Sequence, residues 1–450
     1  MNNKTDQFLN DPIMPLLFKM SAPNTIAFFV QAIVVLTEIW FISKLGTISL
    51  AAVALAFPVL MLTQQMAFGA FGGAVTSSIA RSMGSGDTER AEKLLWHALF
   101  IACAGALILL AAFLVGGEWL LKILGGEGLL LEQSLSYCMI FLSGAILIWL
   151  SGSLSAALRG LGNMRFPAIL MVLASGIQVI LSGGLILGWF GFPKMGISGA
   201  AVSALANGAF MTLIMFLKFS SSSSPIRLKL SRLSPEKELF KDILDVALPA
   251  SLAPVFTVGT ILVLTGLVGQ FGTSALAGYG IGSRVEFLMI PLVFGIGTAM
   301  TAMVGTNIGA KNIARAEKIG FIGGISAGAF AGIIGVILAI TPELWINYFA
   351  TDEATYLVTK QYIQIVGVCY AFQGLGLSLY FASQGANAMK WPIIGTVTRF
   401  IIAALGGSIA VYWFESNLSG IFYSAAAAML IFGLILLISL KMGAWRTNQS

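Results

Sequence analysis

Long apolar stretches alternate with short polar connections along the whole chain. Twelve apolar runs, each roughly the 20 residues that cross about 30 Å of hydrocarbon as a helix, are centred at about positions 28, 64, 105, 145, 177, 208, 256, 292, 328, 370, 402 and 430. Lipid leaves unpaired backbone groups unsatisfied, so every run is predicted to be a helix. The pattern predicts an all-α polytopic membrane protein with twelve transmembrane helices.

The second six runs repeat the first six at an offset of about 225 residues. Gly46 and Gly272 each begin a Gly-Thr pair, and each lies 23 residues after a proline, Pro23 or Pro249. Other pairs at this offset are Arg90-Ala-Glu-Lys93 with Arg315-Ala-Glu-Lys318, Gly160 with Gly385, and Pro167 with Pro392. Duplication in a membrane chain is typical of transporters, and predicts two six-helix bundles with pseudo-two-fold symmetry.

The halves are joined by a polar connection. Five serines at 220–224, then Pro225 and a basic stretch, separate the sixth run from the seventh. We expect an N-terminal bundle at 1–219, a linker at 220–240 and a C-terminal bundle at 241–450. Six crossings return the chain to its starting side, so the repeats are predicted to be parallel.

Composition and charge agree with this plan. The chain is 58% hydrophobic and 10% charged with a mean hydropathy of +0.92, which excludes a soluble domain of 450 residues. Basic residues gather in alternate connections and most densely at 218–241. The positive-inside rule therefore predicts a cytoplasmic linker and cytoplasmic termini. The net charge of +6 is interpreted as orientation and not as nucleic-acid binding.

Of nineteen acidic residues, only Glu38 and Glu286 fall within the apolar runs or at their margins. An ionisable side chain in the bilayer costs free energy, so it is interpreted as functional unless water reaches it. For Glu38 the alternative is a position close enough to the outer interface to be hydrated. Asn24, Gln31 and Glu38 are spaced by seven residues. They form one polar stripe along the first helix, which we expect to face the interior of the first bundle.

Five motifs lie in order along essentially the whole chain. They are Glu38-Ile-Trp-Phe-Ile-Ser-Lys-Leu-Gly46, Leu50-Ala-Ala-Val-Ala-Leu-Ala-Phe-Pro58, Arg159-Gly-Leu-Gly-Asn-Met-Arg165-Phe-Pro167, Tyr279-Gly-Ile-Gly-Ser-Arg284-Val-Glu286 and Gly305-Thr-Asn307-Ile-Gly309-Ala310. In this order and spacing they resemble motifs of the multidrug and toxic compound extrusion (MATE) transporters. The resemblance implies cation-driven efflux of bulky, often cationic or amphiphilic organic compounds across a bacterial cytoplasmic membrane, with no enzymatic activity.

The resemblance also implies site residues. An acid on helix one couples transport to the ion, which assigns this role to Glu38 with Gln31 beside it. On helix five, where many members carry Asn and Asp, the matching residues are Gln178 and Ser182, possible ion or substrate neighbours together with Asn24. Another subgroup uses acids on helices seven and ten, but 250–269 and 367–385 contain none.

A single carboxylate favours H⁺ over Na⁺ as the coupling ion, because Na⁺ is bound best by several hard oxygens. The resulting hypothesis is that Glu38 takes up a proton outside and releases it inside, and that a cationic drug competes for the same charge. Pro23 lacks a backbone donor, so the first helix is expected to bend there when Glu38 is neutralised. No cofactor besides the coupling ion, and no metal, is expected.

A second charged group is predicted around Arg284, Glu286 and Arg399, with a structural ion pair of Glu286 and either arginine favoured over a second coupling or substrate site. Arg284 and Glu286 are two residues apart and point to opposite sides. Adaptable or hydrogen-bonding side chains suit a substrate cavity, although packing is the usual role of such residues. The candidates are Met61, Gln64, Met66, Tyr370 and Gln373.

Two other functions are alternatives to drug efflux. A flippase for a lipid-linked oligosaccharide shares the architecture but uses a cationic cavity, and the first bundle offers one acid. A membrane-embedded transferase needs an acid cluster, but Asp242 and Asp245 are read as a solvated helix start and His97 as a surface residue. The expected partners are the bilayer and small organic cations or amphiphiles, with no nucleic acid, and the protein is expected to be a monomer.

Overall fold

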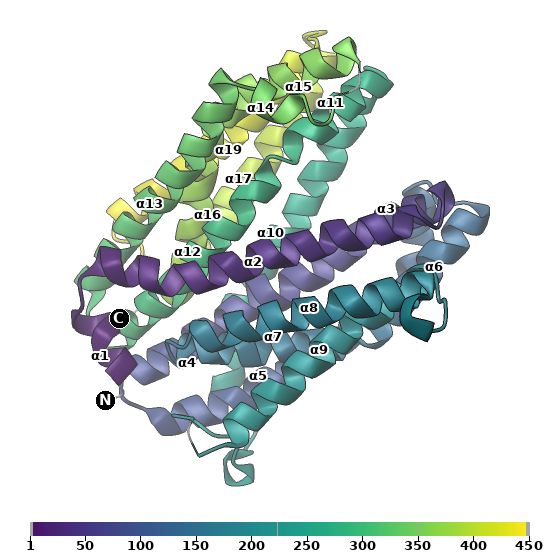
Figure 1. Cartoon of the computed structure of the whole chain (residues 1–450). Coiled ribbons are helices and arrows are strands. Elements are labelled where there is room, and N and C mark those ends of the chain that lie inside the picture. Colours follow the sequence, from purple (N-terminus) through teal and green to yellow (C-terminus); the bar gives the residue numbers. More distant parts are fainter. Residues whose placement is uncertain (1–2, 223, 351, 447–450) are drawn as a thin grey trace. The chain divides into compact units, whose positions relative to one another are not determined.

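Every regular element in the part of the chain that the structure describes, residues 3–222, 224–350 and 352–446, is a helix. The structure is a computed structural model (Figure 1). Among the described residues, eleven helical stretches are long and apolar enough to span a membrane, and α6 (Gly128–Ser143) with α7 (Ala145–Gly160), bent by 47°, makes a twelfth when the pair is counted as one span. The predicted all-α fold is confirmed, with eleven to twelve candidate spans where twelve were predicted.

The chain packs as two compact units that exchange the beginnings of two helices. Unit 1 consists of Met1–Thr5 and Ile26–Leu248, and unit 2 of Asp6–Thr25 and Pro249–Ser450. Helix α2 (Ile13–Ser43) therefore begins in unit 2 and ends in unit 1, whereas α10 (Lys237–Gly269) begins in unit 1 and ends in unit 2. The units thus divide inside helices, beside a proline in each case, and not in the linker.

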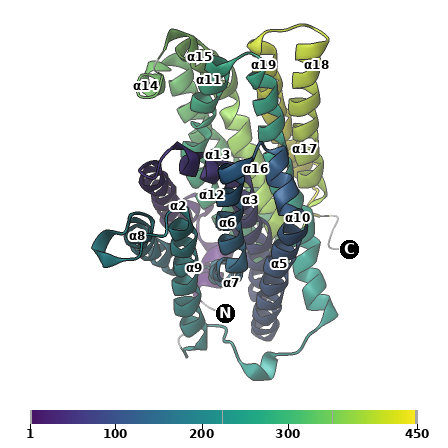
Figure 2. The same ribbon diagram turned by 90° about the vertical axis from the view of Figure 1, so that its right-hand side faces the viewer.

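The other helices of the two units follow chain order (Figures 1 and 2). The short α1 (Asn3–Asn10) precedes α2. Unit 1 contains α3 (Thr47–Gln64), the π-helical turn η1 (Gln65–Phe71), α4 (Gly72–Gly84), α5 (Thr88–Ile123), α6, α7, α8 (Arg165–Leu187), η2 (Trp189–Gly191), α9 (Ile197–Ser220) and η3 (Leu230–Arg232). Unit 2 contains α11 (Thr273–Ser283), α12 (Glu286–Gly309), α13 (Ile313–Ile340), α14 (Glu343–Ile346), α15 (Glu353–Val366), η4 (Gly367–Cys369), α16 (Tyr370–Gly385), α17 (Lys390–Ile401), the π-helical turn η5 (Ile402–Gly406), α18 (Gly407–Tyr412) and α19 (Leu418–Lys441).

The repeated glycines have a conformational reason. Gly46 and Gly272 lie immediately before α3 and α11, with φ angles of 111° and 100°. A residue with a Cβ atom rarely adopts such positive values, so glycine is required at both turns. The repeat in sequence is therefore a repeat of one backbone turn.

A second repeated contact brings helices close together in each unit. A Cβ atom at Gly160 would lie 2.8 Å from the carbonyl oxygen of Thr76, and one at Gly385 would lie 2.5 Å from that of Thr301. The hydroxyl groups of the same threonines donate to carbonyl oxygens of α7 and α16, at 3.0 and 2.8 Å. Small residues that allow close backbone approach are the usual basis of helix packing in membranes.

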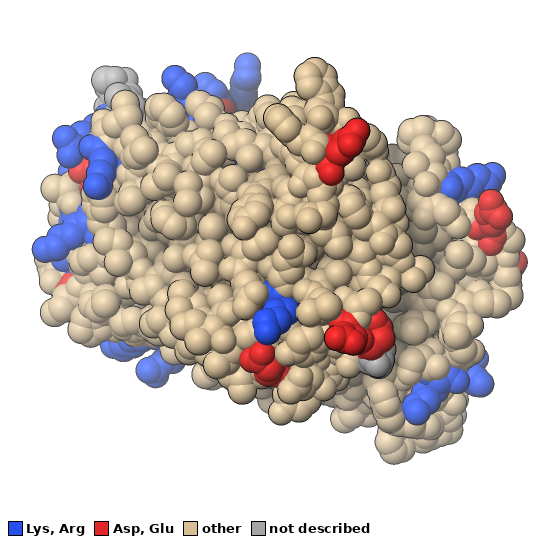
Figure 3. Space-filling view, turned by 90° about the horizontal axis from the view of Figure 1, so that it is seen from above, with Lys and Arg blue, Asp and Glu red and all other residues tan. Residues whose placement is uncertain are grey.

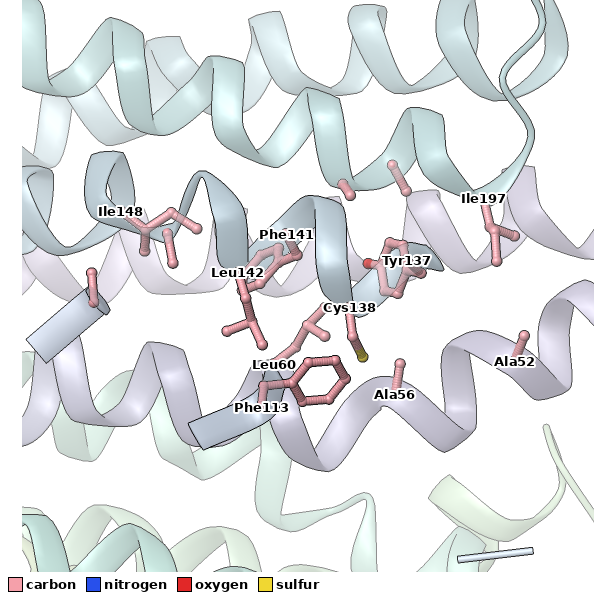
Figure 4. Close-up of a cluster of buried hydrophobic side chains, with 14 of the residues drawn as sticks. Ala52, Ala56, Leu60, Phe113, Tyr137, Cys138, Phe141, Leu142, Ile148 and Ile197 are labelled. Atoms are coloured by element: carbon pink, nitrogen blue, oxygen red, sulfur yellow. The ribbon is translucent and has the colours of Figure 1, made fainter. Parts of the chain in front are cut away.

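The core of unit 1 is packed mainly by apolar side chains from several helices. Figure 4 shows Leu60, Phe113 and Cys138 meeting between their helices, with Tyr137 beside them. Outward-facing residues are also apolar. In the face shown in Figure 3, basic side chains gather at one edge and most of the surface carries no charge, as expected for contact with lipid.

The start of α10 is held in unit 1 by an ion cluster. Asp242 is bound by Arg81 and, at 3.0 Å, by Nη2 of Arg90, and the side chains of Asp242 and Arg81 are each 14% exposed. Asp242 is thus paired and largely buried, which corrects its interpretation as a solvated helix start, whereas Asp245 is exposed. In unit 2 the start of the chain is held similarly, because Nε of Arg315 donates to the carbonyl oxygen of Phe8 at 3.1 Å.

His97 is buried, and its expected surface position is wrong. Its Nδ1 lies 2.7 Å from the carbonyl oxygen of Lys93, and its Nε2 accepts the backbone N–H of Glu236 at 2.9 Å. These partners require the neutral tautomer with the proton on Nδ1. Lys93 also binds the Glu236 carboxylate at 2.8 Å and lowers its pKa. His97 therefore anchors the residue that precedes α10.

Replacing Asp242 with Asn should destabilise the protein by about 3 kcal/mol, since it leaves two arginines without their buried counter-charge. Thermal unfolding of the purified protein in detergent measures the effect. Asp245→Asn, one turn further along the same helix but exposed, is the matched control and should change stability by less than about 0.5 kcal/mol. Equal stability of the two variants would contradict the role of the ion cluster.

Candidate functional site

Glu38 lies in the second half of α2, in unit 1, and is hydrogen-bonded to α8. Its Oε1 accepts Nε2 of Gln178 at 2.9 Å and the hydroxyl of Ser182 at 2.5 Å. Gln178 and Ser182 are four residues apart, so they occupy one face of α8 on successive turns. The two residues matched to the family's helix-five pair thus contact the helix-one acid.

The network continues from Gln178 to a third helix. Nδ2 of Asn207, on α9, donates to Oε1 of Gln178 at 2.5 Å. Figures 1 and 2 show α8 and α9 side by side. Since the amide of Gln178 accepts from Asn207 and donates to Glu38, the three side chains form a directed chain of hydrogen bonds, and such chains strengthen through mutual polarisation.

Gln31 makes a second link between α2 and α8. Its Oε1 accepts the hydroxyl of Ser175 at 3.3 Å. Gln31 pairs with Ser175 and Glu38 with Ser182, and both pairs are 144 residues apart. The two helices therefore run parallel in one register over two turns, and Gln31 lies on the same seam as Glu38.

Glu38 is surrounded by neutral groups. No ion pair involving Glu38, and no cluster of three or more His, Cys, Asp or Glu residues able to hold a metal, occurs among the described residues. Both recorded hydrogen bonds end on Oε1. The site therefore consists of one ionisable group with neutral hydrogen-bond donors.

Asn24 does not belong to this site. It is buried in unit 2, where its Nδ2 donates to the hydroxyl of Thr298 on α12 at 3.1 Å. The polar stripe on α2 is therefore divided, with Gln31 and Glu38 in unit 1 and Asn24 in unit 2. This corrects the grouping of Asn24 with the ion-coupling residues, and the reason is that α2 changes its neighbours after Thr25.

Ser175 and Asn207 were not predicted. Ser175 lies seven residues before Ser182, so the helical spacing that linked Gln31 to Glu38 also marks it. Asn207 is a polar residue in an otherwise apolar run, and such residues usually have a partner inside the protein. Those two signals are present in the sequence, but they do not identify the partners.

The proposed charged group in unit 2 is arranged differently from the expectation. Oε1 of Glu286 accepts the hydroxyl of Tyr362 at 2.9 Å, and Arg284 is exposed. The expected ion pair of Glu286 with Arg284 or Arg399 is not formed among the described residues. Arg399 instead contacts Gln373, one of the predicted cavity residues.

The other predicted cavity residues have mixed environments. Gln64 is exposed and Met61 is half-buried, whereas Met66 packs against the apolar core of unit 1. Tyr370 is 0% exposed and packs within the apolar core of unit 2.

A duplicated, all-helical polytopic chain with a polar group enclosed between spans defines a membrane transporter. The model of the MatE family matches residues 23–182 and 249–409. The chain therefore belongs to the MatE family, whose members are transporters and not enzymes. The matched segments begin at Pro23 and Pro249, the two prolines that mark the duplication.

Curated relatives cover nearly the whole chain. A probable multidrug resistance protein NorM of Thermotoga maritima is 26% identical over 437 residues, which are 95% of this chain and 92% of the relative. An FAD transporter of Shewanella oneidensis is 28% identical and covers 89% of this chain and 90% of its own length. The multidrug export protein MepA of Staphylococcus aureus is 24% identical, with 94% of both chains covered.

Solved structures share the fold over the full length. A transporter of the MOP superfamily from Pyrococcus furiosus, described with a binding pocket of reversed polarity, gives a TM-score of 0.91 at 23% identity. An outward-facing MATE family multidrug transporter gives 0.90 at 23% identity. Each comparison covers 100% of both chains.

Replacing Ser182 with Ala removes one hydrogen bond to Glu38 and should lower drug transport about tenfold, since bonds to charged groups contribute about 1.5–3 kcal/mol. Transport by the purified protein in lipid vesicles is the measurement. Ser175→Ala, on the same helix but bonded to Gln31, is the control and should retain most activity. Wild-type transport by the Ser182 variant would show that this contact is dispensable.

Proposed function

We propose that this MatE-family transporter exports cationic or amphiphilic organic compounds in exchange for protons, and that Glu38 is the group for which proton and cargo compete. The observation that carries the proposal is the setting of Glu38, a carboxylate within a candidate span that accepts hydrogen bonds from Gln178 and Ser182. The names of the relatives NorM and MepA support multidrug efflux.

The donors around Glu38 favour a proton over Na⁺. A bound metal cation needs several oxygen lone pairs directed at it. Gln178 directs its N–H and Ser182 its O–H at the carboxylate, so the nearest groups present hydrogens. No cluster of three or more His, Cys, Asp or Glu residues that could hold a metal ion occurs among the described residues. A proton, by contrast, requires one group only.

Competition for one charge gives exchange. Ionised Glu38 attracts a cation, and protonated Glu38 does not, so proton binding from outside releases the cargo and proton loss inside restores affinity. A ligand shifts a conformational equilibrium only by its difference in affinity for the two states. Neutralisation of Glu38 alters the hydrogen bonds that join α2 to α8, and this change gives the two conformational states different affinities for the proton and for the cargo.

The conformational element is α2 itself. The helix passes from unit 2 to unit 1 two residues after Pro23. Proline lacks a backbone N–H, so one helical hydrogen bond is already missing at that point. Bending there changes the direction of the segment that carries Glu38 without breaking further bonds.

The relatives are named for cargo other than drugs as well. The relative from Shewanella oneidensis is named an FAD transporter, so a flavin nucleotide belongs in the panel of compounds tested on this protein. A lipid-linked oligosaccharide flippase is the alternative function, and it would require neither drug efflux nor the acid at Glu38.

Replacing Glu38 with Gln should abolish drug export driven by a pH gradient while the protein stays folded, because the amide cannot exchange a proton. Vesicles under an imposed pH gradient or an imposed Na⁺ gradient provide the assay, with Glu38→Asp as the control that keeps the charge and part of the activity. Export driven by Na⁺ alone, or full activity of the Gln variant, would refute proton coupling at Glu38.

Replacing Pro23 with Ala restores a backbone donor to α2 and should slow turnover about tenfold or more while drug binding changes little. The comparison of equilibrium drug binding with transport rate measures this separation. Pro58→Ala, in the neighbouring α3, is the control for loss of a membrane-helix proline. Equal loss in both variants would argue against a specific role of the bend in α2.

A further inference from the structure

Unit 2 contains a partly buried positive charge within a span that the proton-coupling proposal does not use. Arg399 is the tenth residue of the candidate span Lys390–Tyr412. At 1.5 Å per residue it lies about 14 Å from the nearer end of the span, too far for the side chain to reach the membrane surface fully. A guanidinium at this depth is costly, so it is expected to serve a function and to face protein, water or a ligand.

The contacts of Arg399 come from three helices. Its Nη1 donates to Oε1 of Gln373 on α16 at 3.3 Å, and its Nη2 donates to the hydroxyl oxygen of Thr257 on α10 at 3.2 Å. The ring of Phe432 lies 5.5 Å from the guanidinium carbon. The π-helical turn η5 follows directly after α17, and such turns are frequent at functional sites.

These contacts leave a set of donors. A guanidinium has five N–H groups, and the two recorded hydrogen bonds use two of them. Gln373 accepts through its oxygen and Thr257 through its hydroxyl oxygen, so their own hydrogens remain to be donated. Arg399, Gln373 and Thr257 are all only partly buried. The group therefore presents a positive charge with several N–H and O–H donors, which is the chemistry that binds an oxyanion.

The charge has no contact counter-ion among the described residues. Glu286 is the acid that senses Arg399 electrostatically, but its carboxylate is bound by Tyr362 and does not lie within ion-pair distance of the guanidinium. A lipid headgroup does not reach the middle of the span. The source of a partner oxyanion is thus a molecule that enters the protein.

We propose that Arg399, with Gln373 and Thr257, binds the carboxylate or phosphate group of an amphiphilic cargo. This proposal rests on the proposed function, because it assumes that the protein transports organic compounds. It adds zwitterions and amphiphilic acids to the cations among those compounds. The two units then carry sites of opposite charge, Glu38 in unit 1 for a cationic group or proton and Arg399 in unit 2 for an oxyanion.

A matched pair of dyes tests the proposal, a cationic rhodamine methyl ester and the same rhodamine as its free carboxylic acid. Arg399→Gln should lower binding and transport of the free acid about tenfold or more, the range of a charge-assisted bidentate contact, and should change those of the ester by less than about twofold. Arg399→Lys, which keeps the charge, should retain part of the preference. Lys390→Gln removes a charge from the exposed end of the same helix and should affect both dyes equally little.

Equilibrium binding in detergent, without any gradient, separates this inference from proton coupling. If the ester is not exported under a pH gradient but the free acid still depends on Arg399 for binding, proton coupling fails and the oxyanion site stands. If Arg399→Gln weakens both dyes equally or neither, the oxyanion site is refuted. If Glu286→Gln restores free-acid binding to the Arg399→Gln variant, Arg399 acts only as a counter-charge to Glu286, and the proposal is likewise overturned.

Discussion

Polar groups inside hydrocarbon must find their partners within the protein, and this constraint organises both units. Lipid offers no hydrogen bonds, so an uncompensated carboxylate or guanidinium in a span is expensive. Glu38 is accommodated by neutral donors from α8, and Arg399 by neutral acceptors from α10 and α16. In both cases the partners are neutral side chains of neighbouring helices, and they satisfy part of the charged group. The proposed binding roles of Glu38 and Arg399 use the part that these partners do not satisfy.

The duplication explains why the scaffold is so regular while the sites differ. Positive-φ glycines at 46 and 272, and glycines at 160 and 385 that admit a neighbouring threonine carbonyl, are requirements of the backbone. A substitution at any of them disturbs the fold of its unit. The polar residues on the spans are not under that constraint, so one unit carries an acid on its first helix and the other an arginine on its fifth. A shared backbone with different polar residues is an economical way to obtain two unlike sites.

The sequence predicts the fold well because hydrophobic length and repeated motifs depend on local chain properties. The resemblance to the family also singles out Gln178 and Ser182 as possible ion or substrate neighbours, and the structure shows both residues hydrogen-bonded to Glu38. The sequence does not predict the place of Asn24, because a seven-residue spacing shows that residues share a face but not that the helix changes neighbours halfway. His97 and Asp242 were misjudged for a related reason. Both lie near polar loops, and their partners come from contacts of the start of α10 and the residue before it with α4 and α5.

The exchanged segments have a consequence for how the protein is made. Residues 6–25 are synthesised among the first but belong to unit 2, and residues 237–248 follow the linker but belong to unit 1. Unit 1 therefore stays incomplete until the second repeat has begun to emerge from the ribosome, and unit 2 must incorporate a segment from the opposite end of the chain. Contacts between such distant segments form late in folding. Cutting the chain at the serine-rich linker would therefore place residues 237–248 of unit 1 on the C-terminal fragment and residues 6–25 of unit 2 on the N-terminal fragment, so that neither fragment contains a complete unit.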